Sequence, residues 1–92
     1  MTITFDPAKR DRTLAERNLD FADAEDVFAG PLVENPDDRF DYGEDRFVTV
    51  GYLGKRMVVV VWTPRDSGRH IISMRKANQR ERKRYGEQLG RS

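Results

Sequence analysis

The sequence predicts a small α+β domain in which an N-terminal strand and a helix hairpin pack on an antiparallel sheet, with a helix at the C-terminus. The most apolar run, Met57–Trp62, is rich in the β-branched residues that strands prefer. Consecutive apolar side chains lie on both faces of a strand, so we expect this run at the centre of a sheet covered on both sides. Asp6 before Pro7 is typical of a helix start. The 92 residues suffice for one domain, residues 1–92, with a small core.

The first third of the chain predicts a strand and two helices. Thr2–Phe5 alternates polar and apolar residues, as a short strand does. Asp6 is the expected cap of a helix at about Pro7–Arg17, and Asp20 of a second helix at about Phe21–Ala29. The connection between them is short, which makes the pair a hairpin. Three apolar residues of the first helix are available for its inner face: Ala8, Leu14 and Ala15.

The rest of the chain predicts an antiparallel meander and a last helix. Residues 30–45 are turn-rich and acidic, with a brief edge strand at Leu32–Glu34. Three strands follow, with expected ranges Arg46–Tyr52, Lys55–Thr63 and Arg69–Lys76. We expect Pro64 to end the second of them and Gly68 to supply positive φ in the loop to the third. An Asn-x-x-Glu capping pair predicts the last helix at about 79–89.

The two halves of the chain carry opposite charge. Residues 1–45 contain five Lys or Arg against thirteen Asp or Glu, whereas residues 46–92 contain twelve against three. A split of this kind indicates a nucleic acid or an acidic protein as the partner of the second half. The alternative is that the two halves neutralise each other across the fold.

Composition argues against several kinds of site. The chain has no cysteine and a single histidine, so we expect no disulfide, no metal site and no cofactor. No apolar run approaches the roughly 20 residues of a membrane span, and the N-terminus lacks the apolar core of a signal peptide. We therefore expect a cytoplasmic protein without membrane association. The glycine-rich and hydrolase signatures of nucleotide-dependent enzymes and catalytic triads are absent.

The clearest functional signal is the basic cluster from Arg65 to Arg84. Arginine prevails in it, and the planar guanidinium suits a bidentate contact with phosphate. Regular alternation would divide the preceding strand into His70, Ile72, Met74 and Lys76 on one face and Arg69, Ile71, Ser73 and Arg75 on the other. His70 then shares a site with Arg75 only if the strand twists or bulges. The alternative interpretations are a solvated basic surface and an ordinary structural histidine.

The run Asp41–Glu44, followed by Arg46, is a second candidate. Paired carboxylates suit acid–base chemistry or metal ligation. A turn in which Gly43 takes an unusual φ and Glu44 pairs with an arginine explains the same residues equally well. Lys9 on the first helix is by itself an ordinary solvated lysine. Tyr85 is either the anchor of the last helix or a phenol at a catalytic site.

Several strings of residues are distinctive in combination. In the first half they are Phe5-Asp6-Pro7-x-Lys9, Thr13-Leu14-x-x-Arg17-x-Leu19-Asp20-Phe21-x-x-Ala24 and Val27-Phe28. In the second half they are Asp41-Tyr42-Gly43-Glu44-x-Arg46, Gly51, Ile72-Ser73-x-Arg75-Lys76-Ala77-Asn78 and Glu81-Arg82-x-x-Tyr85. Together these strings resemble the BrnT toxin family, over about Phe5 to Tyr85 and in the right order. Members of the family often carry Trp, Gly, Arg and Ala where this chain has Phe5, Asn18, His70 and Met74.

The resemblance implies a RelE-like fold and a ribonuclease toxin of a type II toxin–antitoxin pair. Its partner would be a BrnA-like antitoxin with a DNA-binding domain, and the complex would repress its own operon by binding operator DNA through the antitoxin. The toxin would be a metal-independent endoribonuclease that inhibits translation and growth. A module that binds nucleic acid or antitoxin without cleavage, or a degenerate toxin that acts as co-repressor, is the alternative.

A metal-free ribonuclease needs a base for the 2′-hydroxyl, cations for the phosphate and a proton for the leaving oxygen. The catalytic candidates are Arg75 and Arg65 for the phosphate, with Glu44, His70 and Tyr85 for acid–base chemistry in no fixed order. The candidates for binding the RNA backbone are Lys9, Arg69, Lys76 and Arg80. Arginine is not a candidate base because it stays protonated.

Overall fold

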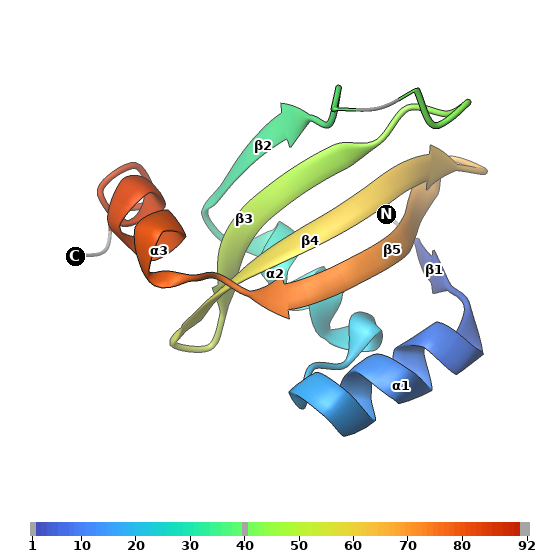
Figure 1. Ribbon diagram of the computed structural model, residues 1–92, viewed down its shortest axis with the longest axis horizontal. Helices are drawn as coiled ribbons and strands as arrows, with labels where there is room; N and C mark the ends of the chain where they lie inside the picture. Colours follow the sequence, from blue (N-terminus) through green and yellow to red (C-terminus); the bar gives the residue numbers. More distant parts are fainter. Residues whose placement is uncertain (1, 40, 91–92) are drawn as a thin grey trace.

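The computed structural model describes residues 2–39 and 41–90 and has the expected α+β architecture, with helices packed against a five-stranded sheet (Figure 1). The strands lie in the order β1-β5-β4-β3-β2, with β4 in the middle. Their bounds are β1 Ile3–Phe5, β2 Leu32–Pro36, β3 Phe47–Leu53, β4 Arg56–Arg65 and β5 Gly68–Lys76. The helical segments are α1 Pro7–Arg17, the 3₁₀ turn η1 Phe21–Asp23, α2 Ala24–Ala29 and α3 Gln79–Gly86.

Strands β2 to β5 form the antiparallel meander that the sequence predicts, and β1 adds a parallel edge to it. Thr4 of β1 is in register with His70 of β5, and Ile3 with Arg69. The sheet is therefore mixed. Parallel neighbours need a long connection, and between β1 and β5 the chain forms the helical segments α1 to α2 and the strands β2 to β4.

Strand β4 is covered on both faces, as its apolar run predicts. On one face, which we call the helix face, a core cluster joins β4 and β5 to the segment Leu19–Val27. The members of this cluster are Leu19, Phe21, Ala24, Val27, Val58, Val60, Trp62, Ile71 and Met74. On the other, which we call the open face, a smaller cluster consists of Val50, Met57, Val59, Ala77 and Leu89. Alternate residues of β4 thus contribute to two separate cores.

Helix α1 has the predicted bounds, but polar contacts and not a buried apolar face hold it to the rest of the domain. Asp6 accepts a hydrogen bond from the N–H of Ala8, and Asn18 ends the helix in the left-handed conformation. None of the residues of α1 is buried, and Leu14 is 36% exposed. Ala8, Leu14 and Ala15 therefore do not form an inner face. Polar contacts hold the helix instead: Arg10 pairs with Asp20 at 2.8 Å, and Arg17 donates to the carbonyl of Met74 at 2.9 Å.

Strand β5 contains a bulge that overturns the regular alternation expected for it. Val61 of β4 pairs with Ser73, whereas the next residue, Trp62, pairs with Ile71. Ile72 is thus an extra residue without a partner in the register, and it shifts the strand by one position. As a result Ile71 and Met74, three residues apart, both lie in the core of the helix face. A bulge re-aims the side chains beyond it in this way.

The β4–β5 hairpin differs from the expectation at two positions. Pro64 does not end β4, which continues to Arg65, and Pro64 is in register with Arg69. The turn residues with positive φ are Asp66 (50°) and Ser67 (64°), not Gly68. Gly68 is needed for another reason, since a Cβ there would lie 2.5 Å from the carbonyl oxygen of Thr2. Its lack of a side chain lets β1 approach the start of β5.

Helix α3 ends at Gly86, three residues before the predicted end, and a turn follows it. Asn78 and Glu81 form the predicted capping box. Leu89, in the turn, packs into the core of the open face, and Tyr85 lies beside it. Within residues 2–39 and 41–90, no helix has the length and apolar character needed to cross a membrane.

Candidate functional site

The bulge at Ile72 brings the catalytic candidates of the hairpin onto one face of the sheet. Arg75 is in register with Val59, which lies in the core of the open face. His70 is in register with Thr63, four positions along β4 from Val59, so it lies on the same face. Arg65 lies two positions beyond Thr63 and also projects to the open face. The bulge therefore fulfils the condition under which His70 and Arg75 share a surface.

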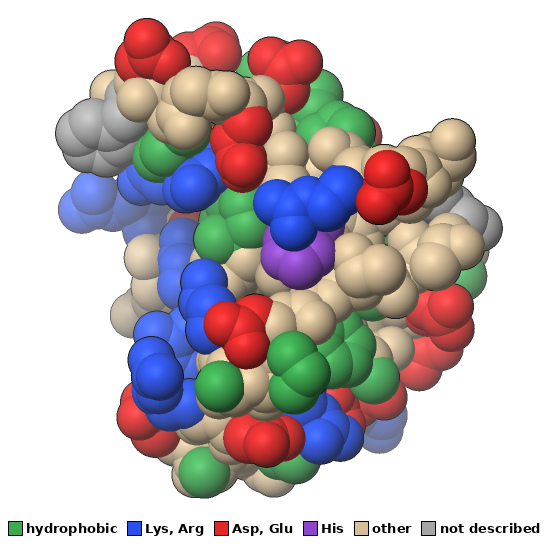
Figure 2. Space-filling view, turned by 90° about the vertical axis from the view of Figure 1, so that its right-hand side faces the viewer, with side chains coloured by type: hydrophobic (Ala, Val, Ile, Leu, Met, Phe, Trp, Pro, Cys, Tyr) green, Lys and Arg blue, Asp and Glu red, His purple; other side chains and the backbone are tan. Residues whose placement is uncertain are grey.

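His70 stands at the hairpin end of the open face, beside β1. Its Nδ1 lies 2.8 Å from Oγ1 of Thr4. Burial lowers the pKa of His70 below its usual value, and the nearby charges of Arg65 and then Lys9 lower it further, against the opposite effects of Glu44 and Asp6. The ring is therefore mainly neutral at pH 7 and can accept a proton. Figure 2 shows the histidine in purple beneath a blue cationic side chain.

The turn at Asp41–Glu44 has the positive glycine φ and the glutamate–arginine contact expected of a purely structural turn. Its Glu44 also lies beside Arg65. Gly43 has a φ of +72°, and its N–H donates to Oδ1 of Asp41 at 3.0 Å. Glu44 lies 3.5 Å from Nε of Arg46 and 3.9 Å from a terminal nitrogen of Arg65. The acidic turn thus places one carboxylate beside Arg65 and near His70.

Arg75 is paired with the last helix instead of with Glu44. Its two terminal nitrogens donate to the two carboxylate oxygens of Glu81 at 2.7 and 2.8 Å. This bidentate contact lowers the pKa of Glu81 to about 2 and raises that of Arg75. A guanidinium has five N–H donors, so donors remain for a further acceptor.

A groove of about 390 Å³ separates Arg75 from the end of β2. Its floor is apolar, and Ser73, Arg75 and Tyr85 stand along it. The lining residues are Asn35, Pro36, Asp37, Asp38, Arg39, Val48, Val50, Val59, Val61, Ser73, Arg75 and Tyr85. Tyr85 thus belongs both to the groove and to the contacts that hold α3 on the sheet. A concave apolar floor with a few convergent polar groups is the usual form of a binding site.

Arg39 lines this groove, although no sequence motif selected it as a site residue. It makes a bidentate contact with Asp37, with distances of 2.9 and 3.1 Å, and this contact lowers the pKa of Asp37. Arg39 and Arg75 both line the groove, and the charge of Arg39 slightly offsets the rise in the pKa of Arg75 that Glu81 causes. Arg39 is the one Lys or Arg between Asn18 and Asp45, and this isolated cation in an acidic stretch was the available signal.

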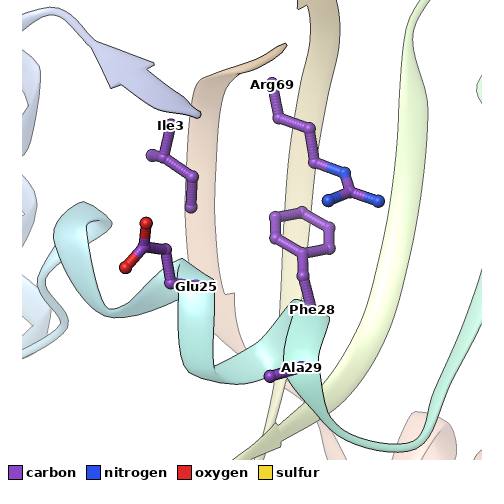
Figure 3. Close-up of a pocket in the computed structure, with 5 residues that line it drawn as sticks. All are labelled: Ile3, Glu25, Phe28, Ala29 and Arg69. Atoms are coloured by element: carbon purple, nitrogen blue, oxygen red, sulfur yellow. The ribbon is translucent and has the colours of Figure 1, made fainter. Parts of the chain in front are cut away.

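Two of the predicted RNA-binding residues lie on the helix face. Arg69 is stacked over Phe28 (Figure 3), with its guanidinium carbon 3.9 Å from the centre of that ring. The same carbon lies 4.9 Å from the ring centre of Trp62. A hollow of about 270 Å³ beside it is lined by Ile3, Glu25, Phe28, Ala29 and Arg69. Lys76 is in register with Val58 and also belongs to this side of the sheet. The other two, Lys9 on α1 and Arg80 on α3, are exposed.

Few ion pairs join the two oppositely charged halves, although their strands and core residues pack together. Among the described residues, the ion pairs between residues 1–45 and 46–92 are those of Glu44 with Arg46 and with Arg65. The remaining pairs join residues of the same half. Figure 2 shows cationic side chains gathered along one margin of the molecule. Among the described residues, direct ion pairs between the halves therefore involve two cations of residues 46–92, Arg46 and Arg65.

No three His, Cys, Asp or Glu side chains converge as metal ligands would, within the part of the chain that the structure describes. The polar groups on the open face are three arginines, each with a carboxylate partner, together with an imidazole and a phenol. The fold and this surface define a small α+β domain whose candidate site displays arginines, the side chains best suited to phosphate contacts.

The comparison with protein families agrees with this class. A model of the family described as the ribonuclease toxin BrnT of a type II toxin–antitoxin system matches residues 5–81. The chain therefore belongs to the BrnT family of ribonuclease toxins, as the resemblance of its residue strings predicts. A search of the curated proteins found no match.

Proposed function

We propose that this toxin is a metal-independent endoribonuclease that binds RNA along the open face and cleaves it at the hairpin end, where His70 and Arg65 meet. The observation that carries the proposal is the bulge at Ile72, which puts His70 and Arg75 on the same surface. From His70 to Arg75 the strand spans roughly 13 Å, so an extended RNA segment can contact both ends. Cleavage of cellular RNA by such a site would inhibit translation and growth.

In this mechanism neutral His70 removes the proton of a 2′-hydroxyl. The 2′-oxygen then bonds to the adjacent phosphorus, and the bond from phosphorus to the 5′-oxygen breaks. The products are a 2′,3′-cyclic phosphate and a 5′-hydroxyl group, whose proton comes from solvent. Arg65 stabilises the charge that develops on the phosphate, and Glu44 orients Arg65 through their contact at 3.9 Å.

The Arg75 end of the open face binds the neighbouring nucleotides. Arg75 and Arg39 contact phosphates from the two sides of the groove, and Tyr85 offers an aromatic face to a base. Lys9 and Arg80 add phosphate contacts at the two ends of the RNA path. Arg69 and Lys76 lie on the helix face, and we assign them no more than a contribution to the general positive field.

The experiment uses the purified toxin, an end-labelled RNA and the same oligonucleotide with one 2′-deoxy position, each with and without EDTA. We expect cleavage that survives EDTA and fails at the 2′-deoxy position. His70→Ala should lower the turnover rate by about 10²–10⁴-fold. Arg75→Ala should mainly weaken RNA binding. Arg12→Ala, which removes an exposed cation of α1, is the matched control and should change neither.

Binding without cleavage would contradict the enzyme and support the alternative, a non-catalytic module or co-repressor. The same variants can be expressed in bacteria while growth and total RNA are followed. Growth arrest with RNA loss that His70→Ala and Arg75→Ala abolish, and Arg12→Ala does not, is the expected result. Intact RNA at full expression of folded toxin is the result that excludes the proposal.

We further propose a cytoplasmic BrnA-like antitoxin as the partner, in a complex that binds operator DNA through the antitoxin and represses its own operon. Type II toxins act with a protein antitoxin, and the basic open face suits an acidic protein segment. Co-expression with the neighbouring reading frame should give a complex that shifts operator DNA in a gel. The toxin alone should give no sequence-specific shift, and a specific shift by the toxin alone would contradict the proposal.

A further inference from the structure

Thr4 and His70 meet where the N-terminal edge strand β1 lies beside β5. The parallel pairing of β1 with β5 puts the two residues in register, and Oγ1 of Thr4 lies 2.8 Å from Nδ1 of His70. The close approach of β1 depends on Gly68, where a side chain would meet the backbone of Thr2.

We propose that Thr4 is a positioning residue for His70: its hydroxyl oxygen accepts a hydrogen bond from Nδ1–H, so that Nε2 is the nitrogen that exchanges a proton with the substrate. This inference rests on the function proposed above, in which His70 is the base. It adds a residue from the N-terminal edge strand to the cleavage site, whose other proposed residues are Arg65 on β4, His70 on β5 and Glu44 in the loop before β3.

The direction of the hydrogen bond follows from the two protonation states of the ring. A neutral imidazole carries its proton on one nitrogen, and an imidazolium ion carries protons on both. If the hydroxyl of Thr4 donated to Nδ1, the bond would have to reverse each time the ring took up a proton. If the oxygen of Thr4 accepts from Nδ1–H, the same bond persists in both states. Only the second arrangement holds the ring still through a cycle of proton transfer.

The charges around the ring make this choice of nitrogen matter at neutral pH. Arg65 on β4 and Lys9 on α1 disfavour the imidazolium ion, while Glu44 before β3 and Asp6 at the cap of α1 favour it. Burial of the ring has the largest effect and also disfavours the imidazolium ion, so the pKa of His70 is lowered on balance. The ring is then mainly neutral before the reaction, and the position of its one proton decides whether Nε2 can act as a base.

The single histidine allows a direct test, because the imidazole nitrogens give two unambiguous signals in a long-range ¹H–¹⁵N spectrum. Above the pKa of the ring we expect the proton on Nδ1 in the unsubstituted toxin. Thr4→Val keeps the shape and strand preference of the side chain but removes the oxygen, and should move the population toward Nε2–H. Thr4→Ser restores the hydroxyl and should restore the spectrum. Thr2→Val, two residues earlier, is the matched control and should change nothing.

RNA cleavage provides the second readout. Thr4→Val should lower the turnover rate about tenfold at unchanged KM, the effect of losing one hydrogen bond to the base, and Thr4→Ser should recover it. A proton on Nε2 in the unsubstituted toxin, or a spectrum that Thr4→Val leaves unchanged, overturns the inference whether or not RNA is cleaved. Absence of cleavage with the proton on Nδ1 would instead contradict the proposed function alone.

Discussion

Arg69 and His70 are neighbours in the sequence, yet they lie on opposite faces of the sheet and in opposite environments. Arg69 is stacked on Phe28 and Trp62 over the helix-face core. His70 is on the open face, where the side chains of Thr4, Arg65 and Glu44 surround it. A cation on the helix face closes a core, whereas polar groups on the open face stand beside a groove.

The arginines on the two faces also differ in the groups that they contact. Aromatic rings hold Arg69, and its Nε is buried without a hydrogen-bond acceptor among the described residues. Carboxylates hold Arg39, Arg65 and Arg75 on the open face. Those of Glu44 and Glu81 are partly exposed, whereas that of Asp37 is buried and its partner Arg39 is exposed. A phosphate can replace or join an exposed carboxylate but cannot replace a packed ring. This difference is the reason for placing the proposed function on the open face.

The largest effect should come from deletions that test the bulge on which this division depends. Deletion of Val59 shifts β4 by one position and sends core residues to the wrong faces, so we expect no stable fold. Deletion of Ile72 removes the unpaired residue and leaves regular alternation, with Ser73 and Ile71 opposite their present partners. That variant should fold, with a loss of about 1–2 kcal/mol for a half-buried side chain, as measured by urea unfolding. Equal damage from both deletions would contradict this register of β4 with β5.

Arg69→Ala sharpens the comparison between the faces. The substitution removes the cation over Phe28 and uncovers part of the helix-face core, so the free energy of unfolding should fall by about 1–2 kcal/mol. RNA cleavage under conditions where the variant is folded should stay within about twofold of the parent rate, since Arg69 is remote from the open face. A fall in cleavage comparable to that of Arg75→Ala would mean that RNA also reaches the helix face.

The smallest effect concerns Glu81 and the pH dependence of stability. Because Arg75 lowers the pKa of Glu81 to about 2 from a usual value of 4.5, the ion pair stabilises the fold fully above pH 4.5. That contribution disappears as the pH falls from 4.5 toward 2. Glu81→Gln preserves the capping box and removes the charge. It should lower the free energy of unfolding by about 1 kcal/mol at pH 7 and have little effect near pH 2, as urea titrations at both pH values would measure. A difference that does not vary with pH would contradict the assignment of this stability to the ion pair.

Local patterns alone determined much of this protein. The run Met57–Trp62 indicated a central strand with two covered faces, because side-chain alternation is a property of the strand itself. Asp6 and the pair Asn78/Glu81 marked helix starts, because capping is settled within a few residues. The strings shared with the BrnT family identified the toxin class. The basic hairpin and the acidic turn were both correctly selected as regions where charge is displayed.

Tertiary structure decided which of these residues meet. The extra residue Ile72 is invisible as such in the sequence, because a bulge is defined by the pairing of two strands. The partners of Arg75 and His70 come from α3 and β1, and Arg39 reaches the groove from an acidic loop. Leu14 was available for an inner face of α1 but is 36% exposed, and residues of the segment Leu19–Val27 form the helix-face core with β4 and β5 instead. Contacts between distant segments depend on how the elements pack, and packing is a property of the whole chain.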